Sequence, residues 1–140
     1  MFATLFIALY LAHLAADYPC QTDAQARCKA GWTDDHGLHH HGWGAAAAHA
    51  ATHVLLCGTA LVAVALVLDE VVLYLWPTVA ALAVIGLTHG WIDRRWPVEA
   101  WMRLARQTKW AAHGGAAHVD QTAHVLVLGV VALALAAVGQ

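Results

Sequence analysis

The chain has 140 residues, of which 61% are hydrophobic and 11% are charged, and its formal net charge is -2. A soluble domain of this length is closer to half apolar and a quarter charged, so the composition predicts a membrane protein with a single domain, residues 1–140. The small net charge argues against a nucleic-acid partner. Cys20, Cys28 and Cys57 do not form a secreted disulfide pattern, and we expect free thiols.

The first apolar segment spans residues 2–17. It is short for a membrane span, which needs about 17 to 25 residues, so a signal peptide is the alternative interpretation. No Lys or Arg precedes its apolar core, and no small-residue cleavage site is well placed. We therefore expect a retained first helix, followed by a polar loop over residues 18–43.

The second and third apolar segments cover residues 44–68 and 71–93, and Asp69-Glu70 predicts a tight turn between them. Pro77 lies near the start of the third segment, where a kink is tolerated if neighbouring helices satisfy the freed backbone groups. Both segments are long enough to cross a bilayer. The pattern predicts two antiparallel spans joined by a short turn.

A second polar stretch, residues 94–115, contains a helical pattern over 97–109 that Gly114-Gly115 ends. One side of this helix carries charge and the other is apolar, which is typical of a helix lying in the membrane interface. The two sides are Glu99, Arg103 and Arg106 against Val98, Trp101, Met102 and Ala105. The last apolar segment covers residues 116–138.

All seven Lys and Arg residues lie in the two longer loops: Arg27, Lys29, Arg94, Arg95, Arg103, Arg106 and Lys109. The positive-inside rule then places these loops in the cytoplasm and both termini outside. Six of the seven tryptophans lie at or in the same loops: Trp32, Trp43, Trp91, Trp96, Trp101 and Trp110. The expected fold is all-α, a bundle of four transmembrane helices plus a short interfacial helix, in the cell (inner) membrane.

Each apolar segment carries one pair of polar residues four positions apart, and such residues share one face of a helix. Because chain direction alternates from span to span, all four pairs are expected at the cytoplasmic end. If each pair faces the bundle interior, five histidines and three aspartates converge there. The pairs are His13/Asp17, His49/His53, His89/Asp93 and Asp120/His124.

An aspartate inside a membrane helix costs several kcal/mol (about 2.5 or more) unless it is paired or hydrated, so such residues mark ion paths, proton relays or metal sites. Imidazole and carboxylate groups at this spacing ligate metals, and four-helix bundles build dinuclear sites from inward-facing ligands. The alternative is a ring of polar residues that only hydrogen-bond helix to helix. Recurrence on all four helices favours the metal site.

The predicted ligands to a divalent metal are Asp17, His49, His53, Asp93, Asp120 and His124. His13 and His89 are expected either to complete a second metal site or to act as catalytic acid and base. Gln21 and Gln121 are candidates for orienting the ligands, although an ordinary loop residue is an equal interpretation of Gln21. His118 should face elsewhere, and the run His36-Gly-Leu-His39-His40-His41 is more typical of a solvated loop.

Three motifs together resemble the bacterial and phage membrane proteins of the domain-of-unknown-function 3307 family. They are His13-Leu-Ala-Ala-Asp17-Tyr-Pro-Cys-Gln21-Thr22, His89-Gly-Trp-Ile-Asp93 and Asp120-Gln121-Thr-Ala-His124, with the histidines of the second segment between them. The resemblance covers nearly the whole chain. It supports the four-helix layout and the ligand set, and it implies no particular reaction.

The first functional hypothesis is a metal-dependent hydrolase that uses zinc on a lipid or lipid-linked substrate from the cytosolic leaflet. A membrane di-iron oxygenase is the second, with iron as the metal. A metal or proton transporter or a metal-sensing protein is the non-enzymatic alternative, and haem bound by two histidines is a further one. Membrane lipids are the expected partners, and a homo-oligomer is compatible with the sequence.

Overall fold

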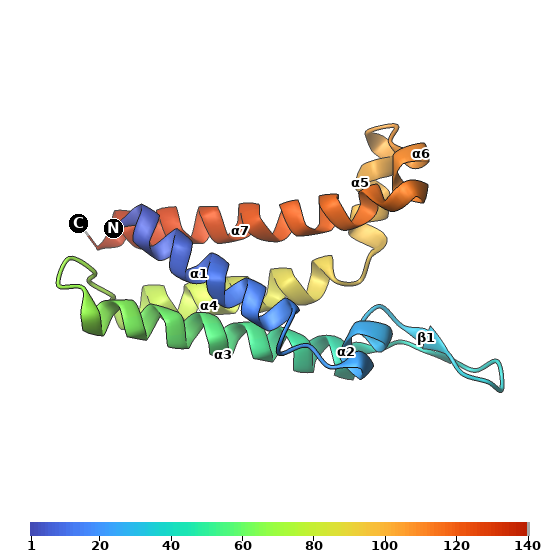
Figure 1. Cartoon of the computed structure of the whole chain (residues 1–140), viewed down its shortest axis with the longest axis horizontal. Helices are drawn as coiled ribbons and strands as arrows, with labels where there is room; N and C mark the ends of the chain where they lie inside the picture. The colour runs from blue at the N-terminus through green and yellow to red at the C-terminus, as the bar shows by residue number, and fades with distance from the viewer. Residues whose placement is uncertain (140) are drawn as a thin grey trace.

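The computed structural model describes residues 1–139, and four long helices lie side by side along its longest axis (Figure 1). The long helices are α1 (Phe2–Asp17), α3 (Trp43–Val67), α4 (Leu75–Ile92) and α7 (Ala116–Val138). α1 and α4 each contact both α3 and α7, so the helices form a closed ring of four. The start of α1 and the end of α7 lie together at one end of this bundle.

Shorter elements gather at the opposite end of the bundle (Figure 1). They are α2 (Asp23–Cys28), the strands β1 (Trp32–Thr33) and β2 (His39–His40), α5 (Trp96–Leu104), α6 (Thr108–Trp110) and a π-helical turn, η1 (Ala111–Gly115). The two polar loops of the sequence are therefore partly folded. They cover the end of the bundle at which the four polar pairs were expected.

The bundle interior is apolar, and so is much of its outer surface. Leu5, Leu61 and Leu128 are almost completely buried in one core, whereas Leu66 and Leu87 on the outer faces of α3 and α4 are 81% and 76% exposed. Among residues 1–139, three helical segments are long and apolar enough to cross a membrane: Trp43–Val67, Leu75–Ile92 and Thr108–Val138. α1 is apolar but has 16 residues, so the four spans remain a prediction.

The third helix starts later than its sequence pattern indicated. The prediction placed its start at residue 71, but α4 begins at Leu75 and leaves residues 68–74 as the link to α3. Pro77 consequently lies in the first turn of α4, where its missing N–H has no partner within the helix. It is tolerated there as a helix-starting residue, and a kink within the span is not needed to explain it.

The predicted interfacial helix is shorter than expected. α5 ends at Leu104 rather than at 109, and the non-glycine residues Arg95 (φ 64°) and Arg106 (φ 57°) adopt left-handed conformations on either side of it. Val98 and Met102 are buried, as expected of its apolar side. Trp101 is 58% exposed, so it does not pack in the protein core with them, and its expected place in the membrane interface stays a prediction. Ala105, also exposed, lies beyond the end of the helix.

The first polar loop contains structure that its composition did not suggest. Thr22 and Gln25 form a reciprocal capping box, with Oγ1 of Thr22 accepting from the Gln25 backbone and Oε1 of Gln25 accepting from the Thr22 backbone. Such a box satisfies two free N–H groups and starts a helix. This is why α2 forms here, and it carries the following residue, Lys29, back to the bundle.

Histidines of the run 36–41 belong to a hairpin turn organised by Asp34. Oδ1 of Asp34 accepts from the backbone N–H groups of His36 and Leu38, and its Oδ2 lies 2.9 Å from Nε2 of His40. The hydrogen bond from His40, together with those from the backbone, holds the pKa of the Asp34 carboxyl below its ordinary value. Within residues 1–139, none of these histidines belongs to a cluster that could hold a metal ion.

Close approach of α3 and α4 depends on Gly86. A Cβ added there would lie 2.7 Å from Cγ2 of Val54, whose β-branched side chain is stiff in a helix. We expect Gly86→Ala to lower the free energy of unfolding by about 1–3 kcal/mol through overpacking. The matched control is Gly58→Ala at the same interface, where the added Cβ would lie 3.4 Å from a Leu82 methyl group. Equal melting temperatures for the two variants would contradict the prediction.

Candidate metal centre

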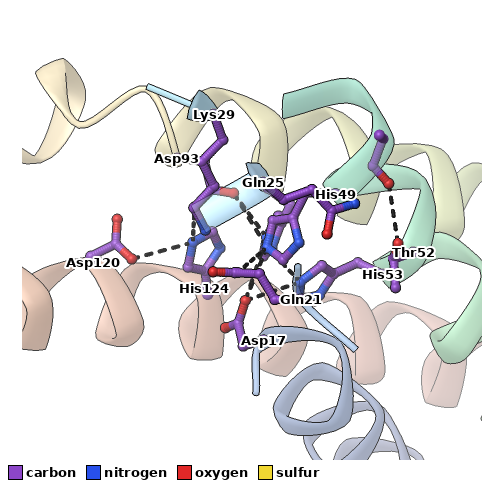
Figure 2. A network of polar contacts seen from close by, with 12 residues as sticks. Asp17, Gln21, Gln25, Lys29, His49, Thr52, His53, Asp93, Asp120 and His124 are labelled. Atoms are coloured by element: carbon purple, nitrogen blue, oxygen red, sulfur yellow. Dashed lines mark hydrogen bonds and ion pairs between the residues drawn. The ribbon is translucent and has the colours of Figure 1, made fainter. Parts of the chain in front are cut away.

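All four polar pairs meet inside the bundle, close to the end covered by α2 and α5. Figure 2 shows side chains from all four long helices pointing toward one another. Helical spacing explains this, because residues four apart project on the same side and each pair lies near a helix end at the same level. The imidazoles and Asp93 are at most 3% exposed: His13, His49, His53, His89, Asp93 and His124.

The first ligand group consists of Asp17, His49, His53 and His89. Oδ1 of Asp17 lies 3.1 Å from Nε2 of both His49 and His53, and these two nitrogens are 3.3 Å apart. His89 Nε2 is 4.0 Å from the same oxygen. Ligand atoms about 2.0–2.2 Å from a tetrahedral zinc ion lie about 3.3–3.6 Å from one another, so the spacing suits one divalent ion.

With the Asp17 carboxylate ionised, no placement of protons on the two imidazoles satisfies all three contacts. If His49 and His53 both donate through Nε2 to the Asp17 oxygen, the 3.3 Å contact between the two nitrogens is a donor facing a donor. If either nitrogen is instead deprotonated, it faces the carboxylate as acceptor against acceptor. A cation inside the triangle could bind all three atoms at once.

The second ligand group consists of His89, Asp93 and His124. Oδ2 of Asp93 lies 3.2 Å from His89 Nε2, and its Oδ1 lies 3.7 Å from His124 Nε2. Within residues 1–139, His89 Nε2, His124 Nε2 and Asp93 Oδ2 are buried, and their contacts with one another lack hydrogen-bond geometry. Such atoms are costly unless something binds them, so this group also has the character of a cation site.

Asp120 lies at the edge of the second ligand group. Its Oδ2 is 3.6 Å from His124 Nε2, and its side chain is 25% exposed (Figure 2). The two ligand groups thus contain His89, which was expected as a second-site ligand or a catalytic residue. They do not contain Asp120, which was expected as a ligand. The role of Asp120 stays a prediction.

His13 contacts residues of the first ligand group through the atoms that do not face the other ligands. Its Nδ1 lies 3.3 Å from Nδ1 of His53, the ring nitrogen that faces away from the group. Its Nε2 lies 3.1 Å from Oδ2 of Asp17, and Gln121 donates to that same oxygen through Nε2 at 3.1 Å. Contacts of this kind orient metal ligands and raise their basicity. The geometry therefore supports an orienting role for His13 and for Gln121.

Gln21 reaches the first ligand group directly. Its amide Nε2 lies 3.1 Å from Nε2 of His49, at the nitrogen that also faces Asp17. The assignment of amide oxygen and nitrogen follows from the hydrogen-bond network, so either atom of the Gln21 amide can face the group. Of the two equal interpretations of Gln21, this position favours the one in which it orients a ligand.

Lys29 is the site residue that the sequence reasoning missed. Its Nζ lies 2.9 Å from Oδ1 of Asp93, and the lysine side chain is only 16% exposed. Arg94 fixes this end of α2, because it donates to the Lys29 carbonyl at 2.7 Å and lies 4.2 Å over the Trp43 ring. The sequence signal that could have drawn attention to Lys29 is the capping motif from Thr22 to Gln25, because it starts the short helix that ends at this residue.

A polar cavity of about 470 Å³ opens onto the second ligand group. Asp93 and Asp120 line it from α4 and α7, Lys29 lines it from the end of α2, and Arg95 and Glu99 line it from the region of α5. Asp93 is the member of the second ligand group that borders this cavity. Its surroundings contain both cations and carboxylates.

Residues 5–140 match the family model described as protein of unknown function (DUF3307). No curated protein and no solved structure matches the chain. The matched range includes every residue of the two ligand groups and the residues that orient them.

Proposed function

We propose that this chain, which belongs to the DUF3307 family of proteins of unknown function, is an integral membrane hydrolase with a divalent-metal centre. The metal we assign is zinc, and the substrate class is a lipid or a lipid-linked molecule. The observation that carries the metal centre, on which the proposal rests, is the triangle of Asp17, His49 and His53 atoms, with edges of 3.1 to 3.3 Å, inside an apolar bundle.

The proposed membrane placement uses all four long helices as spans, with the charged loops in the cytoplasm and both termini outside. It is supported by the outward-facing leucines and valines of α3, α4 and α7. Exposed tryptophans at the loop end, among them Trp43, Trp91 and Trp96, suit a membrane interface. The metal centre then lies just inside the cytosolic leaflet, within reach of lipid headgroups.

The two ligand groups have different expected roles. With His89 assigned to it, the first group offers four ligands, and a zinc site with four protein ligands is typically structural. Asp93, His124 and Asp120 would then hold a second metal ion, and one side of that ion would face the polar cavity. Three protein ligands plus water is the arrangement of catalytic zinc, which lowers the pKa of its bound water and polarises a carbonyl or phosphoryl group.

Metal analysis of detergent-purified protein tests this proposal. We expect two equivalents of zinc in the wild type and one in Asp93→Ala. His118→Ala is the matched control: this exposed histidine on α7 contacts the Gly114 carbonyl and belongs to neither ligand group, so it should retain both ions. Incubation with extracted membrane lipids should then give hydrolysis products that disappear on chelation.

Two results would overturn the proposal. Folded wild type without metal would leave the polar pairs as a hydrogen-bonded helix-packing network. Stoichiometric iron with an iron-dependent optical spectrum would replace the hydrolase by the di-iron oxygenase.

A further inference from the structure

A second, apolar cavity lies next to the polar one, between α4, α5 and α7. Its volume is about 720 Å³, within the range of pockets that enclose small ligands. The walls are mostly aromatic and aliphatic, and include Trp91, Ile92, Val98, Trp101, Trp110 and Val127. On one side it rests on the buried contact between Ile92, Val98 and Met102.

The two cavities are neighbours, because Val98 lines both of them. One is apolar and is lined on α7 by residues that include the exposed Leu126, and the other holds Asp93 and Asp120 beside Lys29 and Arg95. A molecule that fills both must be amphiphilic. Its apolar part would point away from the ligand groups, and its polar part would point at them.

Arg95 gives the polar cavity a cation in an unusual backbone conformation. It lies between α4 and α5 with φ 64° and ψ -38°, a region that non-glycine residues rarely adopt. Backbone strain of this kind clusters at ligand-binding and catalytic sites. Together with Lys29, Arg95 places two positive side chains in the lining of the cavity that borders Asp93 of the second ligand group.

We propose that the two cavities bind one anionic glycerophospholipid of the cytosolic leaflet. One acyl chain fills the apolar cavity, and the phosphate lies in the polar cavity near Arg95 and Lys29. Arginine and lysine both bind phosphate well, and a metal ion on the second ligand group would add positive charge beside the three carboxylates. This inference deepens the proposed function and rests on it for the statement that the bound phospholipid is the substrate.

The test is photo-crosslinking of the full-length protein in nanodiscs, with a phosphatidylglycerol that carries a diazirine on its acyl chain. We expect labelled peptides from the walls of the apolar cavity. Ala123→Phe, which fills the cavity from α7, should lower this labelling about ten-fold, because the chain loses its space. The matched control Leu133→Phe, exposed on the same helix and away from the cavity, should label as the wild type does.

The headgroup is tested separately. Phosphatidylglycerol should label the cavity more strongly than phosphatidylcholine, and Arg95→Gln should remove that preference. Arg103→Gln should keep the preference, because Arg103 is exposed on α5 and does not line the polar cavity. Equal labelling by both lipids in the wild type would overturn the anionic assignment.

Failure of this inference is distinguishable from failure of the proposed function, because crosslinking requires neither metal nor turnover. Metal content is measured on the same samples. Labelling of a protein that contains no metal would support the lipid site and contradict the hydrolase proposal. Bound metal without labelling of the cavity would contradict the lipid site and leave the metal centre supported. Should Ala123→Phe fail to fold, Thr122→Trp at the exposed rim of the cavity replaces it, and unchanged labelling in that variant would overturn the inference.

Discussion

Asp17→Asn is expected to abolish metal binding at the first ligand group and the thermal stabilisation that accompanies it. Oδ1 of Asp17 faces both His49 and His53, and its Oδ2 contacts His13 and Gln121, so this carboxylate links α1 to α3 and α7. Asparagine has the same shape but carries no charge, and its NH₂ group would face an imidazole nitrogen. The first group would lose its only anionic ligand.

The size of the effect follows from binding linkage. A ligand at a thousand times its dissociation constant stabilises the folded state by about 4 kcal/mol, which for a chain of this size is roughly 10 °C in melting temperature. We expect wild type to show a shift of this order between zinc and chelator, and Asp17→Asn to show a much smaller one. The measurement is thermal unfolding in detergent, followed by intrinsic tryptophan fluorescence.

Asp23→Asn is the matched control, because Asp23 lies in the first turn of α2 outside both ligand groups. It should keep the full zinc-dependent shift. A full shift in Asp17→Asn would mean that the Asp17 carboxylate does not bind the metal.

Positions of the polar pairs were predictable because two simple regularities determine them. Residues four apart share a helix face, and consecutive membrane helices alternate in direction. His13/Asp17 at the end of α1 and His49/His53 in the first turns of α3 meet for these reasons alone. The apolar segments could be predicted equally well, and α3 and α7 lie within one residue of the ranges expected for them.

Features that depend on tertiary contacts were not predictable in the same way. Val71 is apolar and lies in the core, but it precedes α4 rather than belonging to it, because hydrophobicity does not distinguish a packed link from a helix. The contact of Lys29 with Asp93 joins residues 64 positions apart. This contact depends on the fold of the first polar loop. From the sequence, the positive charges of that loop predicted only the side of the membrane on which it lies.

The different roles of the site residues could be assigned only from the structure. Spacing alone treats His13 and His89 alike, since each precedes an aspartate by four residues. The packing separates them: Nε2 of His89 lies within 4.0 Å of both Asp17 and Asp93, whereas His13 contacts the outward-facing atoms of Asp17 and His53. Differences of this kind arise from helix rotation, which a periodic pattern does not specify.

Lys29→Met is expected to be strongly destabilising in metal-free protein. It removes the cation 2.9 Å from Asp93, a carboxylate only 3% exposed, and leaves a buried charge without its partner. Breaking a buried pair in this way typically costs about 3–5 kcal/mol. Arg103→Gln is the contrast, because its 3.9 Å pair with Glu99 is exposed on both sides and should contribute nothing measurable.

Two further measurements identify the cause of the Lys29→Met effect. Adding Asp93→Asn should recover most of the lost stability, because the uncompensated charge is then absent. Zinc should also reduce the penalty in the single variant, since a metal ion on the second ligand group would supply the positive charge that Lys29 provided. If zinc leaves the penalty unchanged while the double variant recovers, Asp93 is paired only with Lys29 and is not a metal ligand. That result would confine metal binding to the first ligand group.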